Sequence, residues 1–290
     1  MPELKYAVHA YAWTTHWSNE TLPILDRARK LGFDVLEIPL MEPDDVDPAA
    51  IAARAADAGI RVCCSTACSA ENDITSDDPA VRTAGLAYLN RCVELTAAMG
   101  ARALTGVLYS AIGGKLDGFP THEHWRRSAD ALRTVARHAA SLGVTLGLEP
   151  VNRYETFLVN TAAQALRLRE MIGEPNVGVH LDAYHMNIEE TDFYTPVLNA
   201  VPHLCHFHMS ESHRGTPGAG VVDWPAIYRA LADGGYEGLV GLESFIEGSP
   251  AMRAATCIWR PLAESSDRLL SEGLAYLRAV ERVTYGRPAS

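Results

Sequence analysis

The sequence predicts an α/β protein in which a single (β/α)8 barrel, or TIM barrel, extends over residues 1–290. Short apolar runs rich in Val, Ile and Leu alternate with longer segments of helical periodicity, and eight such units follow one another. No linker separates the units, and 290 residues are usual for one barrel of this kind. An open doubly wound sheet normally carries a glycine-rich loop after its first strand, whereas residues 7–17 contain no glycine. These observations favour the closed barrel.

The strands are the short apolar runs, and the helices are recognised by their ends. Several helical stretches finish on a glycine, which readily adopts the left-handed conformation of a helix C-cap. Asp47 and Asp78 each precede a proline, the pattern of an N-cap followed by the first helical position. The C-terminal stretch 262–283 is also predicted to be helical, as a packing element between subunits or as a cover for the barrel bottom. Strands are expected at 4–9, 34–38, 60–65, 102–107, 144–149, 176–181, 203–208 and 238–243, and the glycine-ended helical stretches at 19–32, 47–59, 79–100 and 123–143.

Composition and charge exclude several classes of protein. Lys and Arg number 25 and Asp and Glu number 36, so the net charge is −11, which would repel a nucleic-acid backbone. No apolar run approaches the roughly 20 residues needed to span a bilayer, and no secretion signal is recognisable, so a cytoplasmic location is expected. The six cysteines lack zinc-ribbon spacing, and the three in "IRVCCSTAC" are expected to be small buried residues.

Ionisable residues stand at the ends of the last four predicted strands. In a (β/α)8 barrel the site is built where strands run into the loops that follow them. Singly, each acid could be an N-cap or a surface group, and a lone His could be an ordinary core residue. Four together, about one unit apart, predict a shared metal site that is rich in oxygen ligands and suits Mn²⁺, Co²⁺ or Mg²⁺. The four are Glu149, Asp182, His208 and Glu243.

Three companions lie shortly after these strand ends. Glu155 follows Glu149 in the next loop, His185 follows Asp182, and Arg214 follows His208. They are candidates for hydrogen bonds to a polyhydroxylated ligand. From spacing alone, Arg214 could equally be a solvated loop charge and His185 a residue of a helix N-terminus.

Four segments together resemble a known family. "LEPVNRYETFLVNTAAQAL", "HLDAYHMNIEETDF", "HFHMSESHRGTPGAGVVDW" and "GLESF" are similar to the ketose 3-epimerases, which comprise D-tagatose, D-allulose (D-psicose) and L-ribulose 3-epimerases. The resemblance implies a barrel of the xylose-isomerase-like class and a homodimer or homotetramer. It also implies four metal ligands, Glu149, Asp182, His208 and Glu243, and sugar binding around O1 to O3 by Glu155, His185 and Arg214.

The same resemblance implies a reaction. A divalent metal, first of all Mn²⁺ with Co²⁺ and Mg²⁺ as alternatives, would hold O2 and O3 of a ketose and acidify the C3 hydrogen. One of Glu149 and Glu243 would remove that proton to give a cis-enediolate, and the other would return a proton to the opposite face. The implied substrates are free ketohexoses and ketopentoses, interconverted in the pairs D-fructose/D-allulose, D-tagatose/D-sorbose and L-ribulose/L-xylulose.

The resemblance extends less firmly to other positions. Trp13 and residues 106–112 would build an apolar wall near the far end of the sugar. Glu37, at the end of the second predicted strand, would contact the sugar or support the metal ligands, or would be a strand-end acid paired with a basic neighbour. Pro150 departs from the family pattern, and the segments 69–78 and 113–124, expected to shape the pocket for C4 to C6, leave the preferred ketose open.

Three other functions are compatible with the same kind of barrel. An aldose–ketose or hydroxypyruvate-type isomerase would use the same metal and acids but move a proton between C1 and C2. A metal-dependent endonuclease for damaged DNA would need more His ligands and a basic face, which the net charge of −11 disfavours. A non-catalytic sugar-binding barrel would not need two acids on opposite faces of C3.

Overall fold

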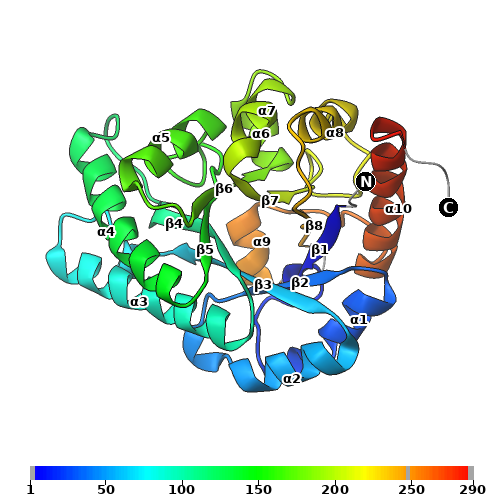
Figure 1. Ribbon diagram of the computed structural model, residues 1–290, viewed down its shortest axis with the longest axis horizontal. Coiled ribbons are helices and arrows are strands. Elements are labelled where there is room, and N and C mark those ends of the chain that lie inside the picture. The colour runs from blue at the N-terminus through cyan, green and yellow to red at the C-terminus, as the bar shows by residue number, and fades with distance from the viewer. Residues whose placement is uncertain (1–3, 246–248, 287–290) are drawn as a thin grey trace.

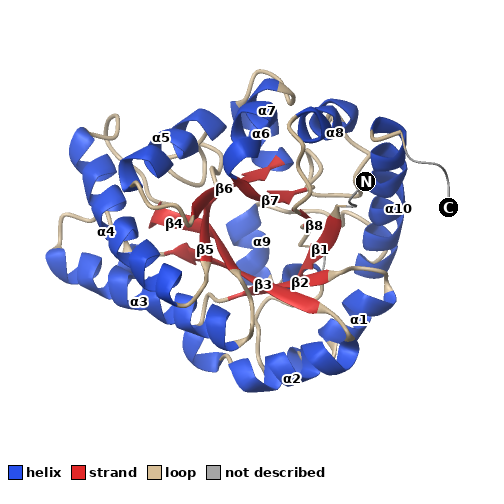
Figure 2. Ribbon diagram, in the orientation of Figure 1, coloured by secondary structure: helices blue, strands red, loops and turns tan. Residues whose placement is uncertain are grey.

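The barrel that the sequence predicts is present in the computed structural model, which describes residues 4–245 and 249–286. Eight strands form a closed sheet in chain order, every neighbouring pair is parallel, and the helices surround the strands (Figures 1 and 2). Because the strands are parallel, their C-terminal ends all lie at one rim of the barrel. The strands are β1 Lys5–His9, β2 Val35–Pro39, β3 Arg61–Cys68, β4 Ala103–Ala111, β5 Thr145–Leu148, β6 Val177–Asp182, β7 Leu204–His208 and β8 Leu239–Leu242.

Strands β3 and β4 run further than predicted, to Cys68 and Ala111. The register between them shifts after Ala67, and Gly106 has a φ of +118°. A Cβ atom on Gly106 would lie 2.2 Å from the carbonyl oxygen of Thr66, so only glycine allows the two backbones to approach this closely. The irregularity lets both strands continue to the rim where the strand ends gather.

The helix ends confirm the predicted caps. All four glycines at the ends of the predicted helical stretches have positive φ. The side chains of Asp47 and Asp78 accept hydrogen bonds from backbone N–H groups in the first turns of the helices that follow them. The stretch 19–32 is only partly α-helical, because Pro23 has no amide N–H and interrupts it. The helices are α1 Ile24–Lys30, α2 Pro48–Ala58, α3 Pro79–Ala98, α4 His122–Ser141, α5 Ala162–Ile172, α6 Ala183–Glu189, α7 Thr195–Ala200, α8 Trp224–Asp233, α9 Pro250–Thr256 and α10 Ser266–Thr284.

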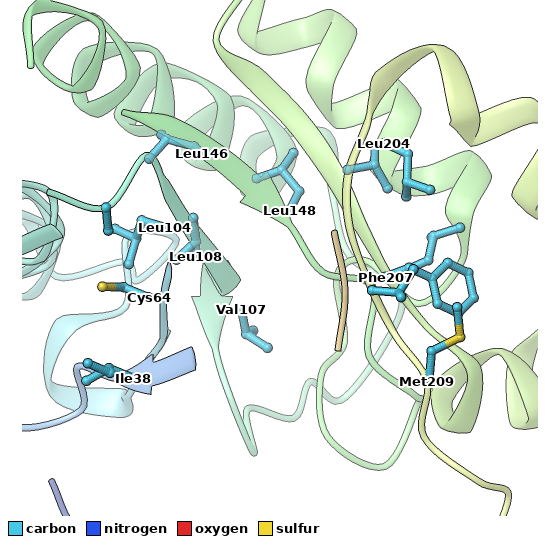
Figure 3. Close-up of a cluster of buried hydrophobic side chains, with 14 of the residues drawn as sticks. Ile38, Cys64, Leu104, Val107, Leu108, Leu146, Leu148, Leu204, Phe207 and Met209 are labelled. Carbon is cyan, nitrogen blue, oxygen red and sulfur yellow. The ribbon is translucent and has the colours of Figure 1, made fainter. Parts of the chain in front are cut away.

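The hydrophobic core lies between the barrel and the surrounding helices. Burial of this apolar layer is the main source of stability for a barrel of this size. Cys63, Cys64 and Cys68 are buried on β3, as the sequence predicts for small apolar residues. Figure 3 shows part of the core, with Ile38 from β2, Cys64 from β3, Leu104, Val107 and Leu108 from β4, Leu146 and Leu148 from β5, and Leu204, Phe207 and Met209 from β7 or next to it.

The last helix, α10, lies on the side of the barrel, between α8 and α1 (Figure 1). It is held there by Glu281, whose carboxylate accepts hydrogen bonds from the Tyr6 hydroxyl at 2.9 Å and from the Leu4 N–H at 3.3 Å. The predicted helix is therefore confirmed, whereas the expectation that it could cover the barrel bottom is wrong. Its place in the ring leaves a role between subunits untested.

Across residues 4–245 and 249–286, no helix combines the length and the hydropathy that crossing a bilayer would require.

Candidate active site

The four ionisable residues predicted from the strand ends come together at one rim of the barrel. Asp182 and His208 are the last residues of β6 and β7, while Glu149 and Glu243 directly follow β5 and β8. The Nδ1 atom of His208 is their common neighbour. A carboxylate oxygen lies 3.7 Å from it in Glu149, 3.7 Å in Asp182 and 3.6 Å in Glu243.

Asp182 has two functions at once, which resolves the choice between an N-cap and a site residue. Its Oδ1 atom accepts a hydrogen bond from the Tyr184 N–H and so caps α6. Its Oδ2 atom faces the site, where it accepts hydrogen bonds from the hydroxyl of Ser210 at 3.1 Å and from Arg214 at 2.9 Å. The cap fixes the side chain, so the second oxygen is held towards the site.

Arg214 supplies the positive charge of the site. Its Nη1 atom lies 2.9 Å from Asp182 and 2.6 Å from Glu243, and its guanidinium stacks 4.0 Å from the ring centre of Tyr184. Burial raises the pKa values of Asp182 and Glu243, but Arg214 and His208 lower them more, so both carboxyl pKa values lie below their usual range. Both groups are therefore ionised at neutral pH.

Glu149 is shifted in the opposite direction. Burial raises the pKa of its carboxyl well above the usual range, and the charges of Glu243 and Asp182 add to this, although His208 opposes them. No hydrogen bond or salt bridge joins Glu149 to Arg214 among the described residues. Two carboxyl groups whose pKa values are pushed apart are the usual arrangement for an acid and a base that share one site.

The donor set fits a divalent cation. His208 Nδ1 is buried and has no hydrogen-bond partner within the described part of the chain, although three carboxylates surround it. One ligand atom each from Glu149, Asp182 and His208 lie within 4.8 Å of one another, and Glu243 adjoins the same nitrogen. Three carboxylates and one imidazole form an oxygen-rich set, as Mn²⁺ and Mg²⁺ prefer. Burial lowers the pKa of His208, but the charges of Glu37 and Glu243 raise it more, well above the usual range. The site therefore favours positive charge at this nitrogen, which a divalent cation would supply.

Two deeper groups of possible ligands lie inside the barrel. They are His180 with His206 and His208, and Glu37 with Cys63 and His206. Both include His206, whose Nε2 already forms a hydrogen bond with Glu37 at 2.8 Å. The group at the rim differs from both in having two members, Glu149 and His208, in the lining of the cavity.

The three companions also reach the site. Glu155, His185 and Arg214 line the same cavity as Glu149, His208 and Glu243. Asn152 arranges two of them, because its side-chain amide donates to Glu155 at 2.8 Å and its backbone N–H donates to His185 Nδ1 at 3.1 Å. Sequence reasoning did not identify Asn152, although its position in the loop after β5 could have suggested it.

The cavity in front of these residues has a volume of about 250 Å³. Helix α9 covers it, and Met252, Ala255 and Thr256 of this helix contribute to the lining. In Figure 1, α9 projects inside the ring of strands. A helical cover and a largely apolar lining reduce the access of water to the reacting groups.

The rest of the lining differs in part from the expectation. Gly106, Val107 and Ile112 do belong to it, as the resemblance implies for 106–112. Trp13 does not, because its indole N–H donates to Asp267 and its ring packs beneath Arg27. No residue of the fully described segments 69–78 and 113–124 lines the cavity. The polar or aromatic lining residues that sequence reasoning missed are His9, Tyr11, Ser65, Thr66, Tyr184 and Phe245.

Glu211 organises the loop that carries Arg214. Its carboxylate is fully buried and accepts hydrogen bonds from the backbone N–H groups of Ser212, Gly218 and Val222 and from the indole of Trp224. Arg214 has a φ of +61°, and its N–H donates to the Glu211 carbonyl oxygen at 2.8 Å. The buried carboxylate of Glu211 thus holds the loop 212–222 at both ends, and this loop places the side chain of Arg214 in the site.

We expect Glu211→Gln to destabilise the protein by about 2–3 kcal/mol at neutral pH, because one amide NH₂ would then face two donors. Burial raises the pKa of Glu211, but these hydrogen bonds lower it more, so its stabilising contribution is complete above the unfolded pKa of about 4.3 and is lost as pH falls through the folded value. Urea unfolding at several pH values should show the difference from wild type shrinking below about pH 4. Glu237→Gln, at an exposed site, is the control; an equal loss in that variant, or a pH-independent difference, would contradict the role of Glu211.

Comparisons with known proteins agree with this geometry. Residues 25–280 match the family model described as the xylose isomerase-like TIM barrel. The chain is 38% identical to the ketose 3-epimerase of Arthrobacter globiformis over 278 residues, covering 95% of this chain and 96% of that protein. It is also 38% identical to the L-ribulose 3-epimerase of Mesorhizobium japonicum over 276 residues, covering 94% and 93% of the two chains. A solved structure of L-ribulose 3-epimerase superposes with a TM-score of 0.93 at 36% identity, covering 97% of this chain and 96% of that one.

The fold and the rim of acids define the class first: the chain belongs to the xylose isomerase-like TIM barrels. Within that class, the sequence identity to ketose 3-epimerases, which extends over nearly the whole chain, identifies the family. The chain is a member of the ketose 3-epimerase family and hence a carbohydrate epimerase, as the sequence motifs predict.

Proposed function

We propose that this chain epimerises free ketohexoses and ketopentoses at C3 in a reaction that depends on a divalent metal ion. The observation that carries the proposal is the pair Glu149 and Glu243. These carboxyl groups come from β5 and β8, both line the cavity, both approach the same nitrogen of His208, and their pKa values are shifted in opposite directions. Inversion at one carbon by two groups needs a proton acceptor on one face and a donor on the other, and these two carboxyl groups can supply both.

In this proposal Glu149, Asp182, His208 and Glu243 would hold the metal ion, with Mn²⁺ as the first choice and Co²⁺ or Mg²⁺ as alternatives. When bound, the ion would supply Lewis acidity that makes the C3–H bond of the ketose more acidic. Glu155, His185 and Arg214 would hydrogen-bond the sugar around O1 to O3 and fix its orientation. Their convergence with the acids in a single cavity supports this assignment.

The chain's own residues carry the proton. The ionised carboxylate on one face removes the C3 proton and leaves a cis-enediolate, and the protonated carboxyl on the other face returns a proton from its side. Because the two epimers present C3–H to opposite faces, the roles of Glu149 and Glu243 exchange between the two directions of reaction. Helix α9 keeps water away from the enediolate, so the returned proton comes from the enzyme.

The proposed substrate pairs are D-fructose/D-allulose, D-tagatose/D-sorbose and L-ribulose/L-xylulose. The names of the relatives support this class, since they include L-ribulose and ketose 3-epimerases. We also propose that residues 1–290 act as one catalytic domain in a homodimer or homotetramer. The exposed aromatic side chains of Phe119, Tyr154 and Trp259 are consistent with contacts between subunits, and light scattering of the purified protein would test the assembly.

The deciding experiment uses D₂O and NMR. Metal-stripped protein is incubated with D-fructose, D-tagatose and L-ribulose, with and without Mn²⁺, and deuterium is followed at each carbon. Metal-dependent label at C3 with formation of the C3 epimer is the expected result. Label at C1 or C2 with an aldose product would instead identify an aldose–ketose isomerase, and no exchange with any ketose would overturn both.

A further inference from the structure

Glu37 is sealed inside the barrel, beneath the candidate site. It lies on β2, its exposed fraction is 0%, and it does not belong to the lining of the cavity. One oxygen of its carboxylate, Oε2, lies 2.8 Å from Nε2 of His206 and 2.8 Å from Nε2 of His208. The residue therefore cannot contact a sugar in the cavity, but it does contact one of the four residues proposed to hold the metal ion.

These two hydrogen bonds determine which nitrogen of His208 carries the hydrogen. An ionised carboxylate can only accept, so the Nε2 atom of each ring must donate. A neutral imidazole that carries its hydrogen on Nε2 has its lone pair on Nδ1. In His208 this is the nitrogen that lies 3.6–3.7 Å from Glu149, Asp182 and Glu243. The bond to Glu37 thus directs the free lone pair into the site.

The surroundings of Glu37 are built to keep both rings in place. Nδ1 of His206 faces the carbonyl oxygen of Leu239 on β8 at 3.3 Å, so the ring lies between Glu37 and this strand. Gly241, two residues further along that strand, leaves room for the pair, since a Cβ atom there would lie 3.0 Å from the His206 ring and 3.3 Å from the His208 ring. Gly241 on one side and the His180 ring, 4.2 Å away between ring centres, restrict the orientation of the His208 ring.

We propose that Glu37 is a positioning residue, which holds His208 in the Nε2–H form so that Nδ1 is the atom offered to a divalent cation. This inference rests on the proposed function only in requiring a cation at the site. Carboxylate partners of metal-binding histidines commonly contribute 10–100-fold to metal affinity. The effect is transmitted through His208, so Glu37 need not touch substrate.

The first test needs no substitution. In the folded wild-type protein loaded with Mg²⁺, which is diamagnetic, long-range ¹H–¹⁵N correlation spectra report the hydrogen on each ring nitrogen of His208. We expect the hydrogen on Nε2 and none on Nδ1. A hydrogen on Nδ1 in the loaded protein, or the absence of any cation binding in calorimetry, would overturn the proposal.

The second test compares two substitutions with a control. Glu37→Met removes the acceptor at similar length and should weaken Mn²⁺ binding by about 10–100-fold in calorimetry. Glu37→Gln keeps one oxygen acceptor and should recover most of that affinity. Glu281→Met removes another buried glutamate, one that contacts Tyr6 and not the site, and should bind Mn²⁺ as the wild type does. Unchanged affinity in folded Glu37→Met would contradict the inference.

These results separate the inference from the proposed function. If wild type binds Mn²⁺ and Glu37→Met binds it more weakly, but no ketose exchanges at C3, then Glu37 positions His208 and the proposed reaction is wrong. If C3 exchange occurs and the affinity does not depend on residue 37, the reaction stands and the inference fails. Activity at saturating Mn²⁺ adds a third readout, since a positioning residue should affect metal affinity more than kcat.

Discussion

Glu243→Gln is expected to lower kcat for C3 epimerisation by about 10²–10⁴-fold. Glutamine keeps an oxygen near His208 and Arg214 but cannot take up or return the C3 proton. Because Glu149 remains, we expect an asymmetric residual reaction. One epimer of a pair should still exchange its C3 hydrogen with D₂O, while neither epimer is converted to the other. NMR of both members of the D-fructose/D-allulose pair in D₂O would measure exchange and conversion separately.

The control for this substitution is Glu174→Gln, which removes a carboxylate that pairs with Arg137 outside the site. It should leave both exchange and conversion unchanged. Rapid conversion by Glu243→Gln would exclude Glu243 from the acid–base pair. Equal exchange of both epimers would be inconsistent with one carboxyl group on each face of C3. Glu149→Gln should give the mirror result, with exchange retained for the opposite epimer.

The sequence predicts those features of the fold that depend on interactions between residues close together in the chain. Apolar runs, glycine C-caps and Asp–Pro N-caps act within a few residues, so all eight strands and the caps of the principal helices were identified. The rim of acids follows from the same information, because every strand end in a parallel barrel lies at one rim. Glu149, Asp182, His208 and Glu243 could be brought together without knowing any contact between them.

The features that were missed depend on packing between distant segments. The orientation of the Trp13 side chain depends on its hydrogen bond to Asp267, on the last helix. Nothing in the sequence near residue 13 indicates that partner. Glu37 and His206 are 169 residues apart in the chain, and their contact needs the exact register of the closed sheet. His9 and Ser65 stand at or near strand ends of the first half, but a lone His or Ser at such a place is also typical of an ordinary core residue, so the sequence did not predict them as site residues.

The balance of charge at the site supports the proposal that a divalent cation acts beside Arg214. Arg214 contacts Asp182 and Glu243, whereas no arginine or lysine pairs with Glu149 among the described residues, and the pKa of Glu149 is raised well above the usual range. The guanidinium of Arg214 thus neutralises part of the negative charge on Asp182 and Glu243. His208 Nδ1, between the three acids, has no partner within the described chain. A cation at that point would neutralise more of the negative charge and lower the cost of ionising Glu149.

Removal of divalent metal is therefore expected to abolish C3 epimerisation, and addition of Mn²⁺ to restore it. Because the cation binds only the folded site, it should also raise the free energy of unfolding, by about 2.7 kcal/mol at a concentration 100 times its Kd. Differential scanning fluorimetry of EDTA-treated protein with increasing Mn²⁺ would measure this shift. Asp182→Asn should reduce both the shift and the recovered activity, whereas the surface variant Asp130→Asn should change neither. Full activity in the presence of excess EDTA would show that the acids act without a metal ion, and would leave the unpaired nitrogen of His208 to be explained by a proton shared with Glu149.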